Sequence, residues 1–136
     1  MMPEIIIDYP PIYDEILSVF PKANRNVIFA WGNKIYNPCN VSIPSQLIVH
    51  ERVHGRRQGN DVDGWWRRYL DEKEFRLAEE VAAHIIEMEY LLGPNPNRQM
   101  RRQIFRSTAK RLSNPLYRYG ISRERAQVLL KEQLTA

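Results

Sequence analysis

The chain contains little cysteine and no long apolar run. Cys39 is the one cysteine among 136 residues, which excludes a disulfide framework and a cysteine-rich zinc site within the chain. The longest apolar runs, residues 5–7 and 27–31, are much shorter than the roughly 20 residues that cross a bilayer. Because Glu4 and Asp8 flank the first run, the N-terminus does not resemble a signal peptide. We therefore expect no membrane partner and a cytoplasmic location.

Charge is unevenly distributed along the chain. Residues 1–97 carry 10 basic and 14 acidic side chains, a net charge of −4, whereas residues 98–136 carry 10 basic and 2 acidic side chains, a net charge of +8. The reversal coincides with the Gly-Pro-Asn-Pro stretch at residues 93–96. A length of 136 residues with 43% hydrophobic content is typical of one globular domain. We predict a single domain with a basic helical C-terminal subregion, residues 97–136, after a first part that ends at residue 93.

Apolar periodicity and turn residues predict a little β structure first and helices afterwards. A β-like run at residues 5–8 precedes a short helical stretch at residues 12–20. Residues 26–31 and 34–36, joined by Gly-Asn, are typical of a hairpin. The fold class we expect is α+β and mostly helical. The later helices are expected at residues 44–59, around Trp65 and Trp66, at residues 72–92, at residues 100–112 and after Ser122.

Two of the three histidines stand four positions apart, in the His-Glu-Arg-Val-His sequence of residues 50–54. On a helix such positions share one face, so His50 and His54 can point at one ion. Glu51 would lie near the same rim, where it can take a proton from water. The spacing therefore predicts a zinc site with two histidine ligands and a glutamate general base. Because chance can also produce this motif, the prediction depends on a third ligand.

Two other metal classes fit the sequence poorly. An extended HExxHxxGxxH pattern needs glycine at position 57 and histidine or aspartate at position 60, where this chain has Arg57 and Asn60. A carboxylate di-iron bundle needs two ExxH motifs. Residues 51–54 supply one, but the second candidate, Glu80 to His84, has the wrong spacing by one residue. We therefore expect neither class.

The predicted helix at residues 72–92 offers the best third ligand. Our choice is Glu80, and its neighbour Glu79, which points about 100° elsewhere on the helix, is the alternative. Asp61 and Asp63 are weaker candidates because they follow the helix-ending Gly-Asn and would need a tight return.

A polar stripe runs along the same helix, with Glu80, His84 and Glu87 at positions i, i+4 and i+7. Small residues at Ala82 and Ala83 would let this helix approach the helix of residues 50–54 closely. His84 could then hydrogen-bond a ligand or a substrate.

The pattern of residues 50–54 followed by Glu80-x-x-Ala83 resembles the zincin metallopeptidases of the gluzincin type, particularly their minimal single-domain forms. The resemblance covers most of the chain from about residue 10. In gluzincins the position four after the ligand glutamate is often aspartate, and here it is His84. More specifically, the chain resembles a family of small phage-encoded HExxH proteins in residues 29–32, 35–38, 50–58, 75–77 and 111–117.

The resemblance implies a zinc-dependent metallopeptidase, a hydrolase acting on a peptide or protein substrate. Zinc on His50, His54 and Glu80 would hold a water molecule and lower its pKa to about 7. Glu51 would take the proton as the water attacks the scissile carbonyl, and would then pass it to the leaving amine. The resemblance thus assigns Zn²⁺ as the cofactor and Glu51 as the catalytic base.

The same resemblance implies two further parts of a peptidase site. Zincins usually align an extended peptide on an edge strand, and the hairpin at residues 26–36 is the natural candidate. A donor that stabilises the oxyanion is also expected, with His84, Tyr117 and Tyr119 as candidates. We interpret Trp65, Trp66 and Tyr69 as packing residues.

Two other functions stay open. The phage resemblance is compatible with a virion or assembly protein on a zincin scaffold, with structural or lost zinc and with other phage structural proteins as partners. Its location would be the virion rather than the host cytoplasm. The basic tail could instead contact nucleic-acid phosphates, although Ile104, Phe105 and Leu112 favour an ordinary exposed helix with an apolar core face. The basic side chains concerned are Arg98, Arg101, Arg102, Arg106, Lys110 and Arg111.

Overall fold

The computed structural model describes residues 2–115 and 120–135, and it confirms a mostly helical α+β fold. A small sheet forms near the N-terminus and long helices follow it, in the order expected from the sequence. Among the described residues, none of the helices combines the length and apolar character that a membrane span requires. The elements are β1 (Glu4–Ile6), α1 (Tyr13–Val19), the 3₁₀ turn η1 (Pro21–Asn24), β2 (Phe29–Trp31), β3 (Lys34–Tyr36), α2 (Ser45–Gln58), α3 (Val62–Asp71), α4 (Lys73–Leu92), α5 (Arg98–Leu112) and α6 (Arg123–Thr135).

The predicted hairpin is present. Strands β2 and β3 pair antiparallel, with Phe29 opposite Tyr36, and Gly32 takes the positive φ of 60° that a two-residue turn requires. Strand β1 adds to the other side of β3 in parallel, so the strand order is β1-β3-β2. This order makes β2 an edge strand, and its open side faces α2.

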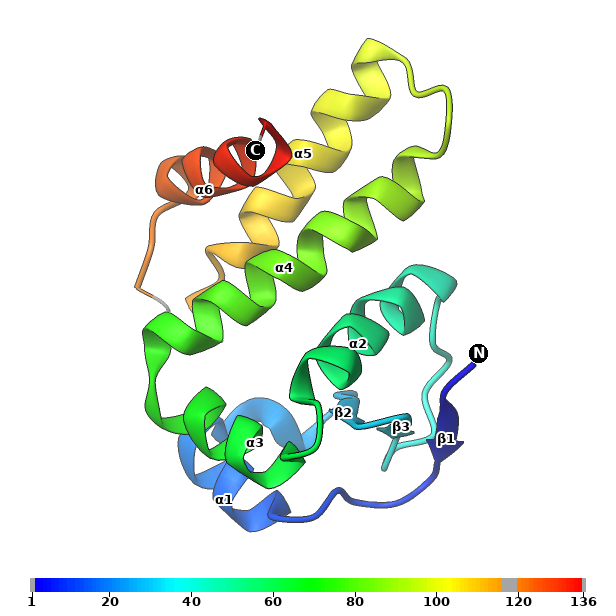
Figure 1. Ribbon diagram of the computed structural model, residues 1–136, viewed down its shortest axis with the longest axis vertical. Helices are drawn as coiled ribbons and strands as arrows, with labels where there is room; N and C mark the ends of the chain where they lie inside the picture. Colours follow the sequence, from blue (N-terminus) through cyan, green and yellow to red (C-terminus); the bar gives the residue numbers. More distant parts are fainter. Residues whose placement is uncertain (1, 116–119, 136) are drawn as a thin grey trace.

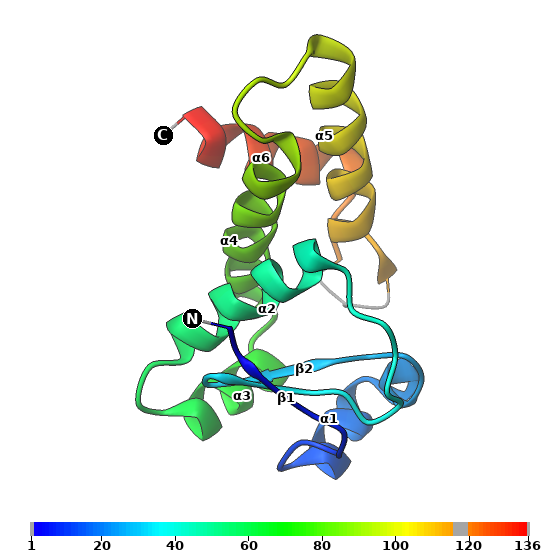
Figure 2. The same ribbon diagram turned by 90° about the vertical axis from the view of Figure 1, so that its right-hand side faces the viewer.

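Helix α4 is the central element. In Figure 1, α5 and α6 lie along one side of α4, while α2, α3, α1 and the sheet lie on the other. Figure 2 shows α2 between α4 and the strands. Gly93, with a φ of 66°, ends α4 and begins the turn to α5, which then runs back beside α4. The chain therefore places α2 and α4 side by side at the middle of the fold.

Two apolar clusters lie on opposite sides of the contact between α2 and α4. Helix α2 itself contributes little to either, because Val53 is its one buried side chain that is aliphatic. The remaining buried positions of α2 are histidine, glycine or glutamine, so this helix is buried through polar groups. The first cluster contains Ile16, Phe20, Phe29, Trp65, Trp66, Tyr69 and Leu70. The second contains Val81, Met88, Ala109, Leu112, Ala126 and Leu130, with Ile104 and Phe105 packed against it.

Helix α2 meets the hairpin through direct backbone contact. A Cβ atom on Gly55 would lie 2.1 Å from the carbonyl oxygen of Gly32, so only glycine allows this approach. Almost one turn later, the Gln58 amide donates to the Ala30 carbonyl at 2.9 Å and accepts from the Gly32 N–H at 2.6 Å. The indole of Trp66 donates to the same Ala30 carbonyl at 3.0 Å. The side chains of α2 and α3 thus satisfy part of the open edge of β2.

We expect Gly55→Ala to destabilise the protein by about 1–3 kcal/mol, because the added methyl group must push the hairpin turn away from α2. Chemical denaturation monitored by circular dichroism measures the change. Helix propensity alone predicts the opposite, a gain of about 1 kcal/mol. Arg56→Ala, at the exposed neighbouring position, is the control and should change the free energy of unfolding by less than about 0.5 kcal/mol. A stabilised Gly55→Ala variant would contradict the close contact.

Candidate metal centre

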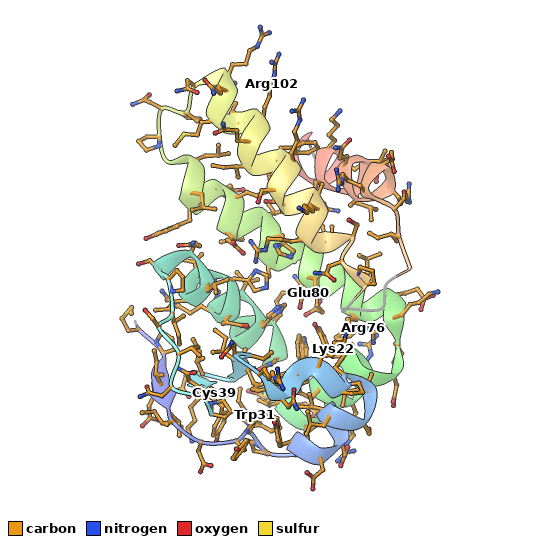
Figure 3. The ribbon with its side chains drawn as sticks, turned by 180° about the vertical axis from the view of Figure 1, so that it is seen from behind. Lys22, Trp31, Cys39, Arg76, Glu80 and Arg102 are labelled. Atoms are coloured by element: carbon orange, nitrogen blue, oxygen red, sulfur yellow. The ribbon has the colours of Figure 1, made fainter. Side chains whose placement is uncertain are left out.

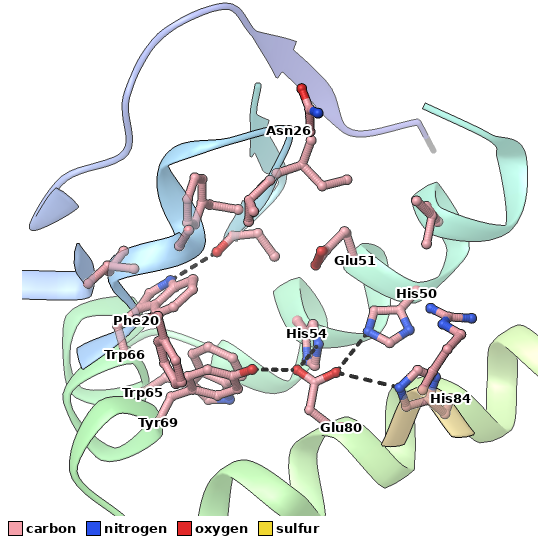
Figure 4. Close-up of a pocket in the computed structure, with 18 residues that line it drawn as sticks. Phe20, Asn26, His50, Glu51, His54, Trp65, Trp66, Tyr69, Glu80 and His84 are labelled. Carbon is pink, nitrogen blue, oxygen red and sulfur yellow. Dashed lines mark hydrogen bonds and ion pairs between the residues drawn. The ribbon is translucent and has the colours of Figure 1, made fainter. Parts of the chain in front are cut away.

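The two histidines of α2 and a glutamate of α4 converge in the interior. His50 Nε2 lies 3.0 Å from Glu80 Oε1, and His54 Nε2 lies 2.9 Å from Glu80 Oε2. All three side chains are buried, and their potential ligand atoms lie within 4.8 Å of one another. Figure 4 shows the two imidazoles and the carboxylate pointing toward one another, with Glu51 beside them. The four-residue spacing on α2 therefore has the geometric result expected from the sequence.

The carboxylate that meets the imidazoles belongs to Glu80 and not to its neighbour. Glu79 turns to the other side of α4, where it accepts hydrogen bonds from Arg57 Nη2 at 2.6 Å and from Trp65 Nε1 at 2.7 Å. Asp61 caps the start of α3 by accepting from the Gly64 N–H at 2.9 Å. Each alternative carboxylate considered from the sequence, apart from exposed Asp63, thus has another structural partner.

The second nitrogen of His50 is held by Glu87. The distance from His50 Nδ1 to Glu87 Oε1 is 2.8 Å, and Arg111 Nη1 of α5 donates to Glu87 Oε2 at 2.5 Å. A carboxylate on the far nitrogen of a metal-binding histidine fixes the ring orientation and raises the basicity of the ligand. The polar stripe on α4 included Glu87, but its partner could not be read from the sequence.

Arg111 differs from the other basic residues of its helix. It reaches inward to Glu87, whereas Arg98, Arg102 and Arg106 are exposed. Figure 3 shows Arg102 at the outer end of α5, well away from Glu80 in the centre of the molecule. Within the described part of α5 and α6, Arg111 is therefore the side chain that reaches the site.

Tyr69 of α3 also contacts the centre, which sequence reasoning did not indicate. Its hydroxyl donates to Glu80 Oε2 at 2.7 Å. The ring is buried in the first apolar cluster and stacks on Trp65 at a centroid distance of 5.0 Å, as expected of a packing residue. No sequence motif marks a tyrosine that will hydrogen-bond the carboxylate, because this contact depends on how α3 packs against α4.

His84 lies beside the three converging groups. Its Nε2 is 4.0 Å from Glu80 Oε1, and its Nδ1 is 3.7 Å from Glu87 Oε1. With His50 and Glu87 it forms a second group that could hold an ion, although this group shares His50 with the first. Of the side chains expected to stabilise an oxyanion, His84 is thus near the centre, while Tyr117 and Tyr119 lie outside the described residues.

Burial and pairing shift the protonation of the converging groups. Burial lowers the pKa of His50, but hydrogen bonds with Glu80 and Glu87 outweigh this effect and raise the pKa to about 10. Burial would raise the pKa of Glu80, yet the charge of His54 and hydrogen bonds with both imidazoles hold it well below its usual range. Burial would also raise the pKa of Glu87, but hydrogen bonds with His50, His84 and Arg111 outweigh burial and lower it. The two carboxylates are therefore ionised and available as ligands.

Glu51 behaves differently from these carboxylates. Burial raises its pKa, and the nearby charges of His54 and His50 offset that rise only in part. A carboxylate with a raised pKa accepts a proton more readily near neutral pH, as a general base must. Glu51 also lines the pocket into which the centre opens, so it is placed where a reacting molecule can reach it.

Comparisons with family models, curated proteins and solved structures find no significant match for this chain. The chemistry is therefore argued from the donor atoms. A tetrahedral zinc ion with bonds of about 2.0–2.1 Å spaces its ligand atoms about 3.3 Å apart. His50 Nε2 lies 3.0 Å from Glu80 Oε1 and His54 Nε2 lies 2.9 Å from Glu80 Oε2, so each imidazole faces its own oxygen of the carboxylate at slightly less than this spacing. With one ligand atom taken from each residue, the three atoms lie within 4.8 Å of one another. Two imidazoles and one carboxylate are donors that zinc accepts, so the residues fit the ion.

We expect the stability of the protein in EDTA to fall as the pH rises above about 6.5. An unfolded histidine loses its proton near pH 6.5, whereas folded His50 keeps its proton until about pH 10. Between these values the folded state binds one more proton, so the free energy of unfolding decreases by up to about 1.4 kcal/mol per pH unit. Urea denaturation at several pH values measures this slope. His50→Gln should remove it, and an equal slope in that variant would contradict the assignment to His50.

Proposed function

We propose that the protein is a zinc-dependent metallopeptidase of the zincin type. The observation that carries this proposal is the convergence of His50 Nε2, His54 Nε2 and the Glu80 carboxylate from two helices. Glu51, next to the first histidine, borders the same pocket. Three protein ligands with a carboxylate base beside an accessible space are the arrangement of catalytic zinc in peptidases, whereas structural zinc usually has four protein ligands.

The side chains of the chain have separate tasks in this proposal. A bound zinc ion would supply a Lewis acid that activates water and polarises a peptide carbonyl. Glu51 accepts a proton and later delivers it to the leaving amine. Tyr69 fixes one oxygen of Glu80, and Glu87 fixes the ring of His50. These hydrogen bonds hold two of the three ligands, Glu80 and His50, in place before an ion binds.

The edge strand β2 is the proposed guide for an extended peptide. Its Ala30 carbonyl already accepts hydrogen bonds from Gln58 and Trp66, so an incoming peptide cannot use that group. Val27 and Ile28, just before the strand, line the pocket beside the metal ligands. The peptide would therefore pair with the backbone of Val27 and Ile28 and not with the whole strand, because Asn26 before them has a φ of 54° and is not extended.

We expect Glu80→Gln and His54→Ala to lose zinc, because each removes one ligand of the centre. Metal analysis of purified protein after dialysis against zinc measures the content. Glu79→Gln is the matched control, since the neighbouring carboxylate points toward Arg57 and should leave the zinc content unchanged. Equal zinc content in the wild type, Glu80→Gln and His54→Ala would contradict the ligand set.

We expect Glu51→Gln to keep its zinc and to lose peptide cleavage by a factor of about 10²–10⁴, because the general base is gone while the ligands remain. Cleavage of a mixed peptide library, followed by mass spectrometry, measures the loss. A wild-type protein that binds zinc and cleaves none of the peptides would instead favour the scaffold function, in which the ion is structural.

We expect Glu87→Gln to weaken zinc affinity about 10–100-fold, because the amide no longer supplies a negative charge to His50 Nδ1. Competition with a fluorescent zinc chelator measures the affinity. Glu89→Gln, two positions along the same helix and exposed, removes the same charge without touching His50 and should leave the affinity unchanged. Identical affinities for the two variants would show that Glu87 does not support the ligand.

A further inference from the structure

Helix α5 carries a row of basic side chains along its exposed surface. The members of this basic row stand four positions apart, so successive members are neighbours on the helix surface. The row turns around the helix by about 40° per step, because four residues slightly exceed one turn of about 3.6 residues. All of its members are exposed. They are Arg98, Arg102, Arg106 and Lys110.

The protein does not neutralise the basic row. Helix α5 contains no aspartate or glutamate. Within residues 2–115 and 120–135, no carboxylate forms a salt bridge with a member of the row. By contrast, the exposed Arg67 of α3 has its Nη1 atom 2.9 Å from Oε2 of Glu15. The neighbouring helix α6 carries acidic as well as basic side chains, so the positive charge is concentrated on α5.

The basic row is unfavourable for the helix that carries it. Like charges four positions apart on a helix repel one another. Arg98 also lies in the first turn, where the helix dipole disfavours a cation and favours acidic residues. Packing does not require these side chains, because they are exposed. A row that conflicts with local helix energetics and adds nothing to the core is typical of a functional surface. An anionic partner would offset both unfavourable effects.

We propose that the basic row binds the phosphate backbone of a nucleic-acid duplex, without reading its base sequence. The inference is independent of the proposed peptidase function, because the metal centre contains none of the four side chains. Figure 3 shows Arg102 at the outer end of α5, well away from Glu80. A duplex lying along α5 would therefore leave the metal centre and its pocket uncovered.

The length and the chemistry of the row suit phosphates. From Arg98 to Lys110 the helix rises about 18 Å, since each residue adds about 1.5 Å. One strand of a duplex places a phosphate about every 3.4 Å along its axis, so the row spans about five phosphates. Three of the four members are arginine, whose planar guanidinium can donate two parallel hydrogen bonds to a phosphate. The exposed Gln103 and Ser107, beside the row, add uncharged donors.

A duplex suits this surface better than a single strand or a membrane. Proteins that bind single strands stack the bases on aromatic side chains. Phe105 is the one aromatic residue of α5, and it packs against the second apolar cluster with Lys131 Nζ 5.7 Å from its ring centroid. Helices that bind membranes insert an apolar face. The apolar face of α5 is already packed into the second apolar cluster. The basic row is therefore what α5 offers to a partner.

Fluorescence anisotropy with a short labelled DNA duplex, recorded in EDTA, tests the proposal. We expect the affinity of the wild type to fall about 100-fold between about 50 and 200 mM NaCl, because four neutralised phosphates give a slope of log K against log salt of about −3.6. Arg102→Gln combined with Arg106→Gln should weaken binding at low salt at least tenfold and should reduce the steepness of this slope by about 2.

Arg56→Gln combined with Arg67→Gln is the matched control. It removes the same net charge from exposed sites on α2 and α3, and it should leave both the affinity and the slope almost unchanged. Circular dichroism and zinc content should be the same for the two double variants, because the substituted side chains are exposed and lie outside the metal centre.

Several results would overturn the proposal. One is no duplex binding by the wild type, and another is binding that does not weaken as salt rises, which needs no variant to detect. Equal loss of affinity in the two double variants would show that net charge, and not the row, attracts the duplex. Equally tight binding to single-stranded DNA, to polyglutamate or to vesicles containing phosphatidylserine would reject the duplex backbone as the partner.

Discussion

The contacts between imidazoles and carboxylates that join α2 to α4 hold the two halves of the molecule together. One apolar cluster lies with α1, the hairpin and α3, and the other lies with α4, α5 and α6. Val53 is the one fully buried aliphatic side chain of α2, and Leu47, Ile48 and Val49 are half-buried, so apolar burial alone does not explain the position of this helix. Ionised groups are costly to bury unless they are paired and hydrogen-bonded. The pairing of His50 and His54 with Glu80 therefore makes the burial of α2 possible.

The groups that position α2 are also the proposed metal donors, so the fold and the proposed metal site depend on the same atoms. Two of the three donors are held by a neighbour from another element: Tyr69 of α3 holds Glu80, and Glu87 of α4, with Arg111 of α5, holds His50. The third donor, His54, has no hydrogen-bond partner at Nδ1 among the described residues. An ion bound here would meet side chains that are already largely oriented, which would reduce the reorganisation required on binding. Four helices thus contribute to one small site: α2 and α4 supply the proposed ligands, and α3 and α5 supply Tyr69 and Arg111.

Much of the fold and part of the site could be predicted from the sequence. The hairpin and helices have periodicities and turn residues that local chemistry determines, and the four-residue spacing of His50 and His54 fixes their common face. The orientation of α4 determines whether Glu79 or Glu80 faces the two histidines. The sequence spacing gives only the angle between the two glutamates around the helix. Tyr69 and Arg111 were harder to foresee, because each meets its carboxylate through packing of separate helices. The sequence shows which residues share one face of a helix. It does not show which residues of two different helices come into contact, because this depends on how the whole core packs.

The contact between Gly55 and the hairpin turn has a mechanical consequence for the neighbouring histidines. At Gly55 the backbones of α2 and of the hairpin turn touch with no side chain between them. His54 is adjacent to this contact, and His50 lies more than one turn away, where Glu80 and Glu87 hold its ring through side-chain hydrogen bonds. A small tilt of α2 about Gly55 would therefore displace the backbone of His50 more than that of His54, so the close backbone contact limits the movement of the second histidine most.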